Sequence, residues 1–380
     1  MSELIQYSTD NDLNLFRPYL VASESPNSSE LKGSEFNYSI ELNFVKQIQW
    51  SPDGTCLLSS STDNIMRTFI ISNNILEQNE ISKLRYFSFT RFAESVYSYL
   101  WYSKMILNVS VRDHPIHLYN ALFSTLKASY PLIDHCERFI APNSLIFSLD
   151  GTRFIAGANN MLSIHALNMY GYGPISIFRT TRRNSSFSLS YPVQKGIISS
   201  LCLNNHKLLA AGTFNATVGI YSNEGEGDIV SLFNVGDGGV TQVLWLDDYK
   251  LLVVSRKSEK MSIWDIRTFS CIKTLGPRFA MTQQRMTVDI WNDYIIAGNI
   301  DGIVRIWNDD KIVLEWKAYN DVVTSSVVHP SYPLVATSSG SRKYKKYFNK
   351  YENDKNIFFQ NYDNSIKLWD LSINNKKGLI

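Results

Sequence analysis

DNSIKLWDL, residues 363–371, is the stretch that decides the fold. It begins with Asp363, a residue type that initiates tight turns. Apolar Ile366 and Leu368 then flank polar Lys367, and the aromatic Trp369 follows. An alternation of apolar and polar residues with a period of two is typical of a strand with one packed face. The stretch therefore predicts a turn that leads into a half-buried β-strand.

The same pattern occurs six more times upstream. The positions that align with the tryptophan are Phe69, Tyr119, His165, Tyr221, Trp264, Trp307 and Trp369. The turn-forming residues six positions earlier are Asp63, Asp113, Asn159, Asn215, Ser258, Asp301 and Asp363. The polar or small residues two positions before the aligned residue are Arg67, His117, Ser163, Gly219, Ser262, Arg305 and Lys367. Seven copies of one strand pattern indicate a repeat architecture.

Each copy is preceded by two further apolar segments around a turn, as in IQWSPDGTCLLSS and SVVHPSYPLVATS, which predicts a hairpin. The aligned residues are 43 to 62 positions apart, near the ~40–45 of a WD40 blade with insertions. We therefore expect an all-β fold, a seven-bladed WD40-type β-propeller with degenerate repeats. No Gly-His dipeptide occurs, and Trp-Asp occurs only at 264–265 and 369–370. The Asp–His–Ser–Trp hydrogen-bond network of standard WD40 blades should be mostly missing, with apolar packing contributing more of the stability.

His114 and His117, in the stretch RDHPIHLYN, are spaced as two ligands of a metal site would be. The repeat places His114 in a turn and His117 within a strand. Residues three apart on a strand point to opposite faces, so the two imidazoles do not converge on one ion. We favour the strand-and-turn interpretation.

The chain divides into three predicted parts. Residues 1–35 are rich in Ser, Asn and Glu and are expected to be loosely ordered, residues 36–372 form the propeller, and residues 373–380 are a short tail. An insertion at about 341–362 interrupts blade seven. Because the last repeat ends on a third strand, the N-terminal region must supply the outer strand of that blade, from FNYSIEL (36–42) or PYLVAS (18–23).

Composition excludes several classes of protein. The 380 residues are 44% hydrophobic and 19% charged with a net charge of +2, as in a soluble globular protein. No apolar run reaches membrane-spanning length, and we expect neither a signal peptide nor a membrane contact. The four cysteines form no C-x-x-C pair, which argues against a disulfide framework or a zinc cluster. No G-x-S-x-G, H-E-x-x-H or Walker lysine loop occurs, so we expect no enzyme, cofactor or small-molecule substrate.

Basic residues concentrate in loops that should share one face. Residues 342–355 hold six Lys/Arg and two Asp/Glu, with aromatics between them, a composition suited to phosphates and unpaired bases. A solvated insertion without a ligand is the alternative. In a four-stranded blade, the loop that enters the blade and the loop between its second and third strands emerge on the same side. The candidate RNA-binding residues on this predicted rim are Arg179, Arg182, Arg183, Arg256, Lys257, Arg278, Gln284, Arg285, Arg342, Lys343, Lys345 and Lys346.

The stretches WSPDGTCLL, VYSYLWYSKM, RDHPIHLYNA and HPSYPLVATSSG occur in an order that resembles the telomerase Cajal body protein family of WD-repeat proteins. The similarity spans about residues 44–370, and Thr282, Gln283, Gln284 and Arg285 fall on the family's Thr-Asn-Gln-Arg motif. The chain is most similar to fungal, splicing-associated members; its blade-seven insertion is basic, whereas that of animal members tends to be acidic.

The resemblance implies a nuclear propeller that binds small nuclear RNA or its ribonucleoprotein and supports pre-mRNA splicing. Its partners would be small nuclear RNA, snRNP proteins and spliceosome components, and we expect a monomer located in the nucleus, with the cytoplasm as a further location. The alternative is a protein–protein scaffold or adaptor with no direct RNA contact. From the residues themselves we expect Arg285, beside a blade-six strand, to brace its loop through backbone hydrogen bonds.

Overall fold

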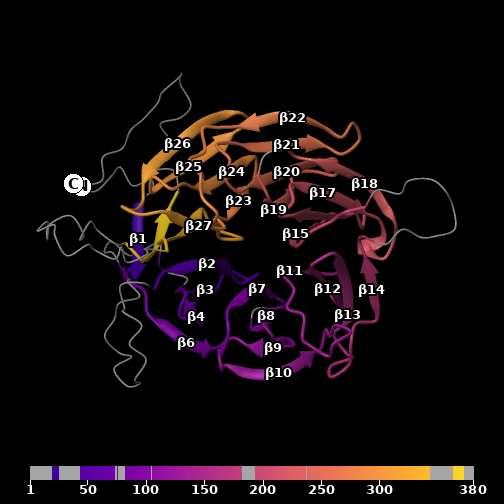
Figure 1. The fold of residues 1–380 in the computed structure, drawn as a ribbon. Coiled ribbons are helices and arrows are strands. Elements are labelled where there is room, and N and C mark those ends of the chain that lie inside the picture. The colour runs from indigo at the N-terminus through magenta and orange to yellow at the C-terminus, as the bar shows by residue number, and fades with distance from the viewer. Residues whose placement is uncertain are drawn as a thin grey trace, which may run out of the picture. The chain divides into compact units, whose positions relative to one another are not determined.

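A computed structural model describes residues 19–24, 43–72, 75, 82–103, 105–181, 193–236, 238–342 and 363–371. The described residues form β-strands, one 3-10 segment (η3, Asn223–Gly225) and no α-helix. None of them forms a helix long and apolar enough to cross a membrane. The strands make seven sheets, antiparallel except for the short β1–β5 pairing, which is a seven-bladed β-propeller, and the fold prediction is confirmed (Figure 1).

The chain forms two compact units, and the first comprises residues 1–87, 286–308 and 312–380. It holds blade seven and most of blades one and six. Blade one consists of β2 (Val45–Trp50), β3 (Cys56–Ser61), β4 (Ile65–Ile70) and β6 (Tyr86–Arg91). Blade six consists of β23 (Val288–Trp291), β24 (Tyr294–Gly298), β25 (Ile303–Asn308) and β26 (Lys311–Lys317). Blade seven consists of β27 (Val323–Val328), β28 (Leu334–Ser339), β29 (Ile366–Asp370), β1 (Tyr19–Glu24) and the short β5 (Ser82–Lys83).

The second unit comprises residues 88–285 and 309–311 and holds blades two to five. Blade two consists of β7 (Val96–Trp101), β8 (Ile106–Val111), β9 (Ile116–Asn120) and β10 (Thr125–Tyr130). Blade three consists of β11 (Ser144–Phe147), β12 (Arg153–Ala158), β13 (Met161–Ala166) and β14 (Ser176–Arg179). Blade four consists of β15 (Ile198–Leu203), β16 (Leu209–Thr213), β17 (Thr217–Tyr221) and β18 (Ile229–Asn234). Blade five consists of β19 (Val240–Trp245), β20 (Lys250–Ser255), β21 (Met261–Asp265) and β22 (Ser270–Leu275).

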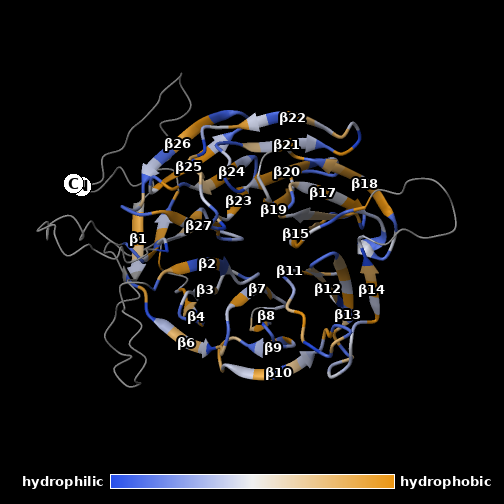
Figure 2. Cartoon of the chain, viewed as in Figure 1, coloured by the Kyte–Doolittle hydropathy of each residue, from blue (hydrophilic) through white to orange (hydrophobic). Residues whose placement is uncertain are grey.

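All seven residues of the aligned column lie in the third strands of their blades, as the repeat predicts. The second strands are buried over most of their length, as in β20, while outer strands such as β22 are largely exposed. Figure 2 shows how hydrophobic and hydrophilic residues are distributed over the strands. Inner strands of neighbouring blades are joined by side-chain hydrogen bonds. Trp50 donates its indole N–H to the carbonyl of Val327 at 3.2 Å in the first unit, and Trp245 donates to Cys202 at 3.1 Å in the second.

The N-terminal region completes blade seven. β1 pairs antiparallel with β29, so PYLVAS is the segment that supplies the outer strand. Val21 and Ala22 on this strand are buried because they pack into the core of the first unit. The first propeller strand therefore precedes the predicted boundary at residue 36 and corrects the expectation that residues 1–35 are loosely ordered throughout. FNYSIEL, most of the 341–362 insertion and the 373–380 tail lie outside the described residues.

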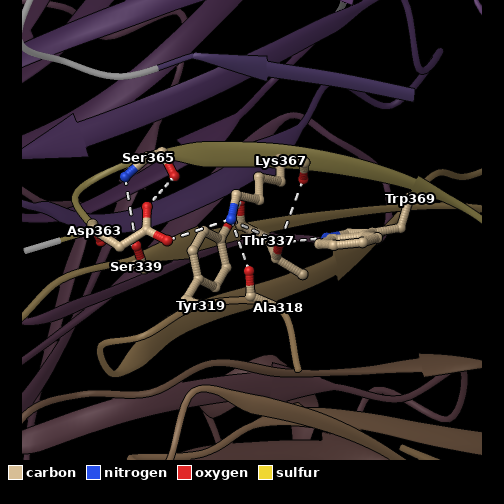
Figure 3. A network of polar contacts seen from close by, with 8 residues as sticks. All are labelled: Ala318, Tyr319, Thr337, Ser339, Asp363, Ser365, Lys367 and Trp369. Carbon is tan, nitrogen blue, oxygen red and sulfur yellow. Dashed lines mark hydrogen bonds and ion pairs between the residues drawn. The ribbon is translucent and has the colours of Figure 1, made fainter. Parts of the chain in front are cut away.

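Blade seven contains a polar network in which other residues replace the usual histidine (Figure 3). Trp369 donates its indole N–H to Oγ1 of Thr337 at 2.8 Å, and the hydroxyl of Tyr319 lies 2.8 Å from the same atom. Nζ of Lys367 lies over the Tyr319 ring at 4.3 Å and reaches Oδ2 of Asp363 at 3.3 Å. Blade seven thus differs from the expectation that such networks are mostly missing, because a tyrosine and a lysine together span the distance that one histidine spans elsewhere.

The two histidines of blade two have separate partners. Nδ1 of His117, on β9, hydrogen-bonds Oγ of Ser129 at 3.0 Å. Nδ1 of His114, in the preceding turn, lies 2.7 Å from the carbonyl oxygen of Arg112. Burial, and then the charge of His114, lowers the pKa of His117. The strand-and-turn interpretation is confirmed.

Candidate nucleic-acid interface

Two loops of the second unit meet beside blade five. The first, between β20 and β21, carries Arg256 and Lys257, and the second runs from β22 to β23. The backbone N–H of Lys257 donates to the carbonyl of Thr282 at 3.1 Å, and that of Arg278 donates to Glu259 at 2.7 Å. The predicted residues Arg256, Lys257, Arg278, Gln284 and Arg285 are therefore brought together by these two loops.

A third loop adds an aromatic ring that the sequence analysis missed. The guanidinium of Arg256 lies over the ring of Phe214 at 4.6 Å, a cation–π contact. Two glycines allow this close packing. A Cβ on Gly239 would lie 2.3 Å from the carbonyl oxygen of Phe214, and one on Gly238 would lie 2.3 Å from that of Arg256. Phe214 stands next to the turn residue Asn215, and its local sequence carries no signal for this contact.

Exposed groups on these loops suit an anionic, aromatic ligand. Lys257 is exposed, and Phe279 and Met281 on the second loop are 42% and 57% exposed. We call Phe214, Arg256, Lys257 and Phe279 the rim cluster. An ammonium and a guanidinium can pair with phosphate oxygens, and an exposed ring can stack on a base.

Arg278 and Arg285 do not belong to the exposed surface, which corrects their predicted place on the rim. Arg278 is 1% exposed, and burial lowers its pKa to about 10. Arg285 is half-buried, and burial lowers its pKa as well. Nη2 of Arg285 donates to the carbonyl of Ser199 on β15, which confirms the expected backbone hydrogen bond. The loop turns these long side chains inward, where they fix its position.

Gln284 also takes part in the shape of this loop. Its backbone N–H donates to Oγ1 of Thr282 at 3.1 Å, and its side chain is half-buried. Of the four residues on the resemblance motif, Gln283 alone is exposed. The motif therefore shapes the loop more than it faces solvent.

The other predicted residues lie apart from the rim cluster or outside the described residues. Arg179 is the exposed last residue of β14, not a loop residue as expected, because the strand pairs with β13 as far as Met161. Arg342 is exposed and belongs to the first unit, close to Lys46 on β2. Burial, partly offset by Asp63, lowers the pKa of Lys46, and the like charge of Arg342 lowers it further. Lys46 is a cation that sequence reasoning missed. The predicted residues outside the described part are Arg182, Arg183, Lys343, Lys345 and Lys346.

One group of potential metal ligands occurs in the described part of the chain. The ligand atoms of Asp134, His135 and Cys136 lie within 4.8 Å of one another. The carboxylate of Asp134 already accepts hydrogen bonds from Nε and Nη2 of Arg138, at 3.1 and 2.9 Å. It also accepts the backbone N–H of Cys136 at 2.7 Å. These contacts explain the group as a tight turn, and we assign no metal to it.

Comparison with known proteins gives a consistent set of relatives. Residues 37–69 match the family model "WD domain, G-beta repeat". Guanine nucleotide-binding protein negative regulator 1 of Schizosaccharomyces pombe is 33% identical over 336 residues, which are 83% of this chain and 82% of that protein. Mouse telomerase Cajal body protein 1 is 28% identical over 333 residues, 81% of this chain. Protein SWT21 of Vanderwaltozyma polyspora is 23% identical over 353 residues, 86% of this chain and 80% of that protein.

The chain spans 61% of the length of the mouse relative. WD40 propellers of this kind are in general not enzymes, and the relatives are consistent with a scaffold or adaptor role. The identity to the S. pombe protein extends over four-fifths of both chains, and the matches to the mouse protein cover the same propeller. The chain belongs to the telomerase Cajal body protein family of WD-repeat proteins.

Proposed function

We propose that this chain is a nuclear WD40 propeller that binds small nuclear RNA or its ribonucleoprotein and supports pre-mRNA splicing. The observation that carries the proposal is the rim cluster, in which loops of blades four and five bring two cations and two rings together. The relatives named for telomerase and the Cajal body favour a nuclear location. SnRNP proteins and other spliceosome components are the protein partners that this function implies.

RNA suits the rim cluster for a physical reason. Phosphates supply the negative charge that Arg256 and Lys257 pair with, and unpaired bases supply flat faces for rings such as Phe279. The half-buried Arg256 is held on Phe214, so little side-chain entropy remains to be lost when it binds a phosphate. A preorganised cation next to an exposed one such as Lys257 is a suitable arrangement for a contact with the RNA backbone.

A second candidate is a protein–protein scaffold with no RNA contact. Large apolar side chains in the loops of blades two and three favour it, since Tyr102, Met105, Met169, Tyr170 and Tyr172 are 42% to 67% exposed. Surfaces that are rich in aromatic residues and methionine are common at protein interfaces. The name of the S. pombe relative, a negative regulator of a guanine nucleotide-binding protein, also points to a protein partner.

Crosslinking the purified or tagged chain to RNA in cells and sequencing what is recovered separates the two candidates. Small nuclear RNA recovered well above background supports the proposal, and background recovery supports the scaffold. A double variant, Arg256→Glu with Lys257→Glu, then tests the rim cluster. We expect it to lower affinity and to reduce the slope of log K against log salt by about 1.4, two phosphates at ~0.7 each for a single strand.

The matched control is Lys127→Glu with Lys207→Glu, which changes the net charge equally at exposed positions away from the rim cluster. Lys207 and Lys257 both have positive φ, 61° and 53°, so the backbone strain is comparable. If the rim variant and the control have the same RNA affinity and the same salt slope, RNA does not bind at the rim cluster.

A further inference from the structure

β14, the outer strand of blade three, is an open sheet edge in the described part of the second unit. It pairs with β13 on one side, and no described strand pairs with its other side. The backbone N–H of Thr180, one residue past the strand, donates to the carbonyl of Asn160 at 3.0 Å. Because inward and outward groups alternate along an antiparallel strand, the N–H and C=O of Ile177 and Arg179 point away from β13. Another strand can pair with these groups.

This edge lacks a protection that the other outer strands of the second unit have. The pairing of each of β10, β18 and β22 with its neighbour contains a register shift, and such bulges hinder the addition of a further strand. β14 pairs with β13 without a shift from Ser176 to Arg179. On its outer face, Ile175 and Ile177 are each 46% exposed. A regular, apolar edge is the kind to which an extended peptide adds.

Blade seven, in the first unit, shows that an outer strand of this protein accepts a fifth strand. There the short β5 pairs in parallel with the outer strand β1, through Ala22 with Ser82 and Ser23 with Lys83. β14 holds the position in blade three that β1 holds in blade seven, at the end of the sheet order.

The charge around β14 favours an acidic partner. Residues 151–223 contain six Lys/Arg and no Asp or Glu. Just past β14, the backbone N–H of Gln194 donates to the carbonyl of Thr180 at 3.0 Å. Arg179 and Lys195, both exposed, are the chain neighbours of this bonded pair, and neither forms an ion pair with a described residue. Two copies of so basic a stretch repel each other, which argues against self-association through β14.

We propose that β14 is a docking site for an extended acidic segment of a partner protein, which adds to blade three as a fifth, antiparallel strand. The backbone of the segment pairs with Ile177 and Arg179, and its alternate apolar side chains pack on Ile175 and Ile177. Acidic residues near its amino end face Arg179 and Lys195. The antiparallel orientation is the more stable pairing.

Nucleic acid is the less suitable ligand for β14. The exposed face of the strand offers two isoleucines and no aromatic ring on which a base can stack. Its outward N–H and C=O groups alternate with the spacing of another peptide strand. The docking site therefore differs in chemistry from the rim cluster, and it does not depend on RNA binding there.

The test measures the binding of a fluorescent peptide to the full chain by fluorescence anisotropy. The peptide begins with a pair of glutamates and continues with alternating valine and threonine, to roughly eight residues in all, the length of an ordinary strand. Ile177→Pro removes an outward N–H and no hydrogen bond to β13, so we expect about tenfold weaker binding. Ile177→Val should bind within about twofold of wild type. Hydrogen exchange at Ile177 and Arg179 should slow when the peptide is bound.

Matched controls separate pairing and charge from folding. Arg179→Glu should weaken binding about fivefold through the loss and reversal of charge. Lys207→Glu changes the charge equally at an exposed position in the turn between β15 and β16, and should leave the affinity unchanged. Both variants should melt at the wild-type temperature. A peptide with N-methylated backbone amides cannot pair with the edge and should not bind; it tests the pairing even if Ile177→Pro lowers the melting temperature.

Two results would overturn the docking site. The first is binding of the methylated peptide as tight as that of the unmodified one, since backbone pairing would then play no part. The second is competition of oligouridylate with the peptide, with Arg179→Glu weakening both and Ile177→Pro weakening neither, which marks a nucleic-acid site.

The rim variant, Arg256→Glu with Lys257→Glu, distinguishes this proposal from the proposed function. It should bind the peptide as wild type does. If the wild-type chain binds the peptide but recovers no RNA from cells, the docking site stands and the proposed function falls. If the wild-type chain recovers small nuclear RNA but does not bind the peptide, the proposed function stands and the docking site falls.

Discussion

The two units of the molecule build the same blade in chemically different ways. In all three blades of the first unit, the turn before the third strand carries an aspartate, and a cation four residues later pairs with it. These pairs are Asp63–Arg67 at 2.6 Å, Asp301–Arg305 at 2.8 Å and Asp363–Lys367 at 3.3 Å. The blades of the second unit have other combinations at the two positions: Asp113 and His117, Asn159 and Ser163, Asn215 and Gly219, and Ser258 and Ser262.

Blade four of the second unit fills the same position with neutral groups. In blade four, where Gly219 has no side chain, Gln194 enters from the preceding loop. Its Oε1 accepts the hydroxyl of Tyr221 at 2.7 Å, and its Nε2 donates to Ala211 at 2.8 Å. In these blades, polar groups therefore occupy the space between the turn and the third strand. Either an ion pair or a side-chain amide can provide them. The two solutions should respond differently to mutation and to pH.

The largest loss of stability is expected when a buried arginine of the first unit loses the carboxylates that pair with it. Arg305 is 5% exposed and pairs with both Asp301 and Glu315, each within 2.9 Å. Asp301→Ala with Glu315→Ala would leave this charge buried without a carboxylate, and we expect a loss of about 3–5 kcal/mol in the free energy of unfolding. Denaturant titration followed by tryptophan fluorescence measures it.

Two comparisons show whether the loss comes from the charge. Arg305→Met added to the double variant should restore most of the stability, because no buried charge remains. In the second unit, replacing the exposed Asn159 by Ala should cost no more than about 0.5 kcal/mol. A double variant as stable as wild type would mean that the ion pairs do not distinguish the units.

The next largest effect is a dependence of stability on pH, which arises from Asp289 in the first unit. Oδ2 of Asp289 on β23 accepts the backbone N–H of Val328 on β27 at 2.8 Å, and burial raises the pKa of Asp289 to about 6. The unfolded value is about 3.9, so the folded state favours the protonated form. This contribution to stability is complete below about pH 4 and is lost as pH rises through 6, by on the order of 2 kcal/mol.

Asp289→Asn cannot ionise, so the difference in unfolding free energy between wild type and variant should change over this pH window and level off above it. Equilibrium unfolding at pH 4, 5, 6 and 7 measures the difference. In the second unit, Ser144 bridges inner strands by donating to Ile198 at 3.0 Å. Ser144→Ala should change stability by the same amount at every pH. If the difference in unfolding free energy between wild type and Asp289→Asn is the same at every pH, the two units do not differ in their dependence on pH.

The smallest expected change in stability concerns the neutral Gln194 side chain that occupies this position in blade four. A Cβ on Gly219 would lie 2.7 Å from Oε1 of Gln194 and 3.0 Å from the ring of Tyr221. Gly219→Ser should therefore lower stability by about 1–2 kcal/mol through overpacking. Adding Gln194→Ala gives the serine room, so the two changes together should cost less than their sum. Strict additivity in thermal or denaturant unfolding would show that the two side chains do not share one space.

The fold was predictable because its signal repeats. A period of two and a turn residue six positions before the aligned residue recur seven times, so errors in one copy do not obscure the others. The aspartate and cation columns were also visible in the sequence, but a column does not show whether two charges pair. The candidate site was harder to predict. In the sequence, Arg278 and Arg285 look like Arg256, since all three are arginines in predicted rim loops. Only the path of the loop decides which guanidinium turns inward.

The rim cluster illustrates the limit in another way. Phe214 lies one residue before a turn, and nothing in its local pattern indicates that a cation from the next blade will lie over it.

The pairing of β1 with β29 has a consequence for the time course of synthesis. β1 can pair with β29 only when the strand near residue 370 has emerged from the ribosome, which at 5–20 residues per second is on the order of tens of seconds after β1 itself. Until then the strand that carries Val21 and Ala22 lacks this pairing. β1 therefore stays without its β29 partner while the strands between them are synthesised. A nascent chain released early would have every earlier blade and no means of closing the last one.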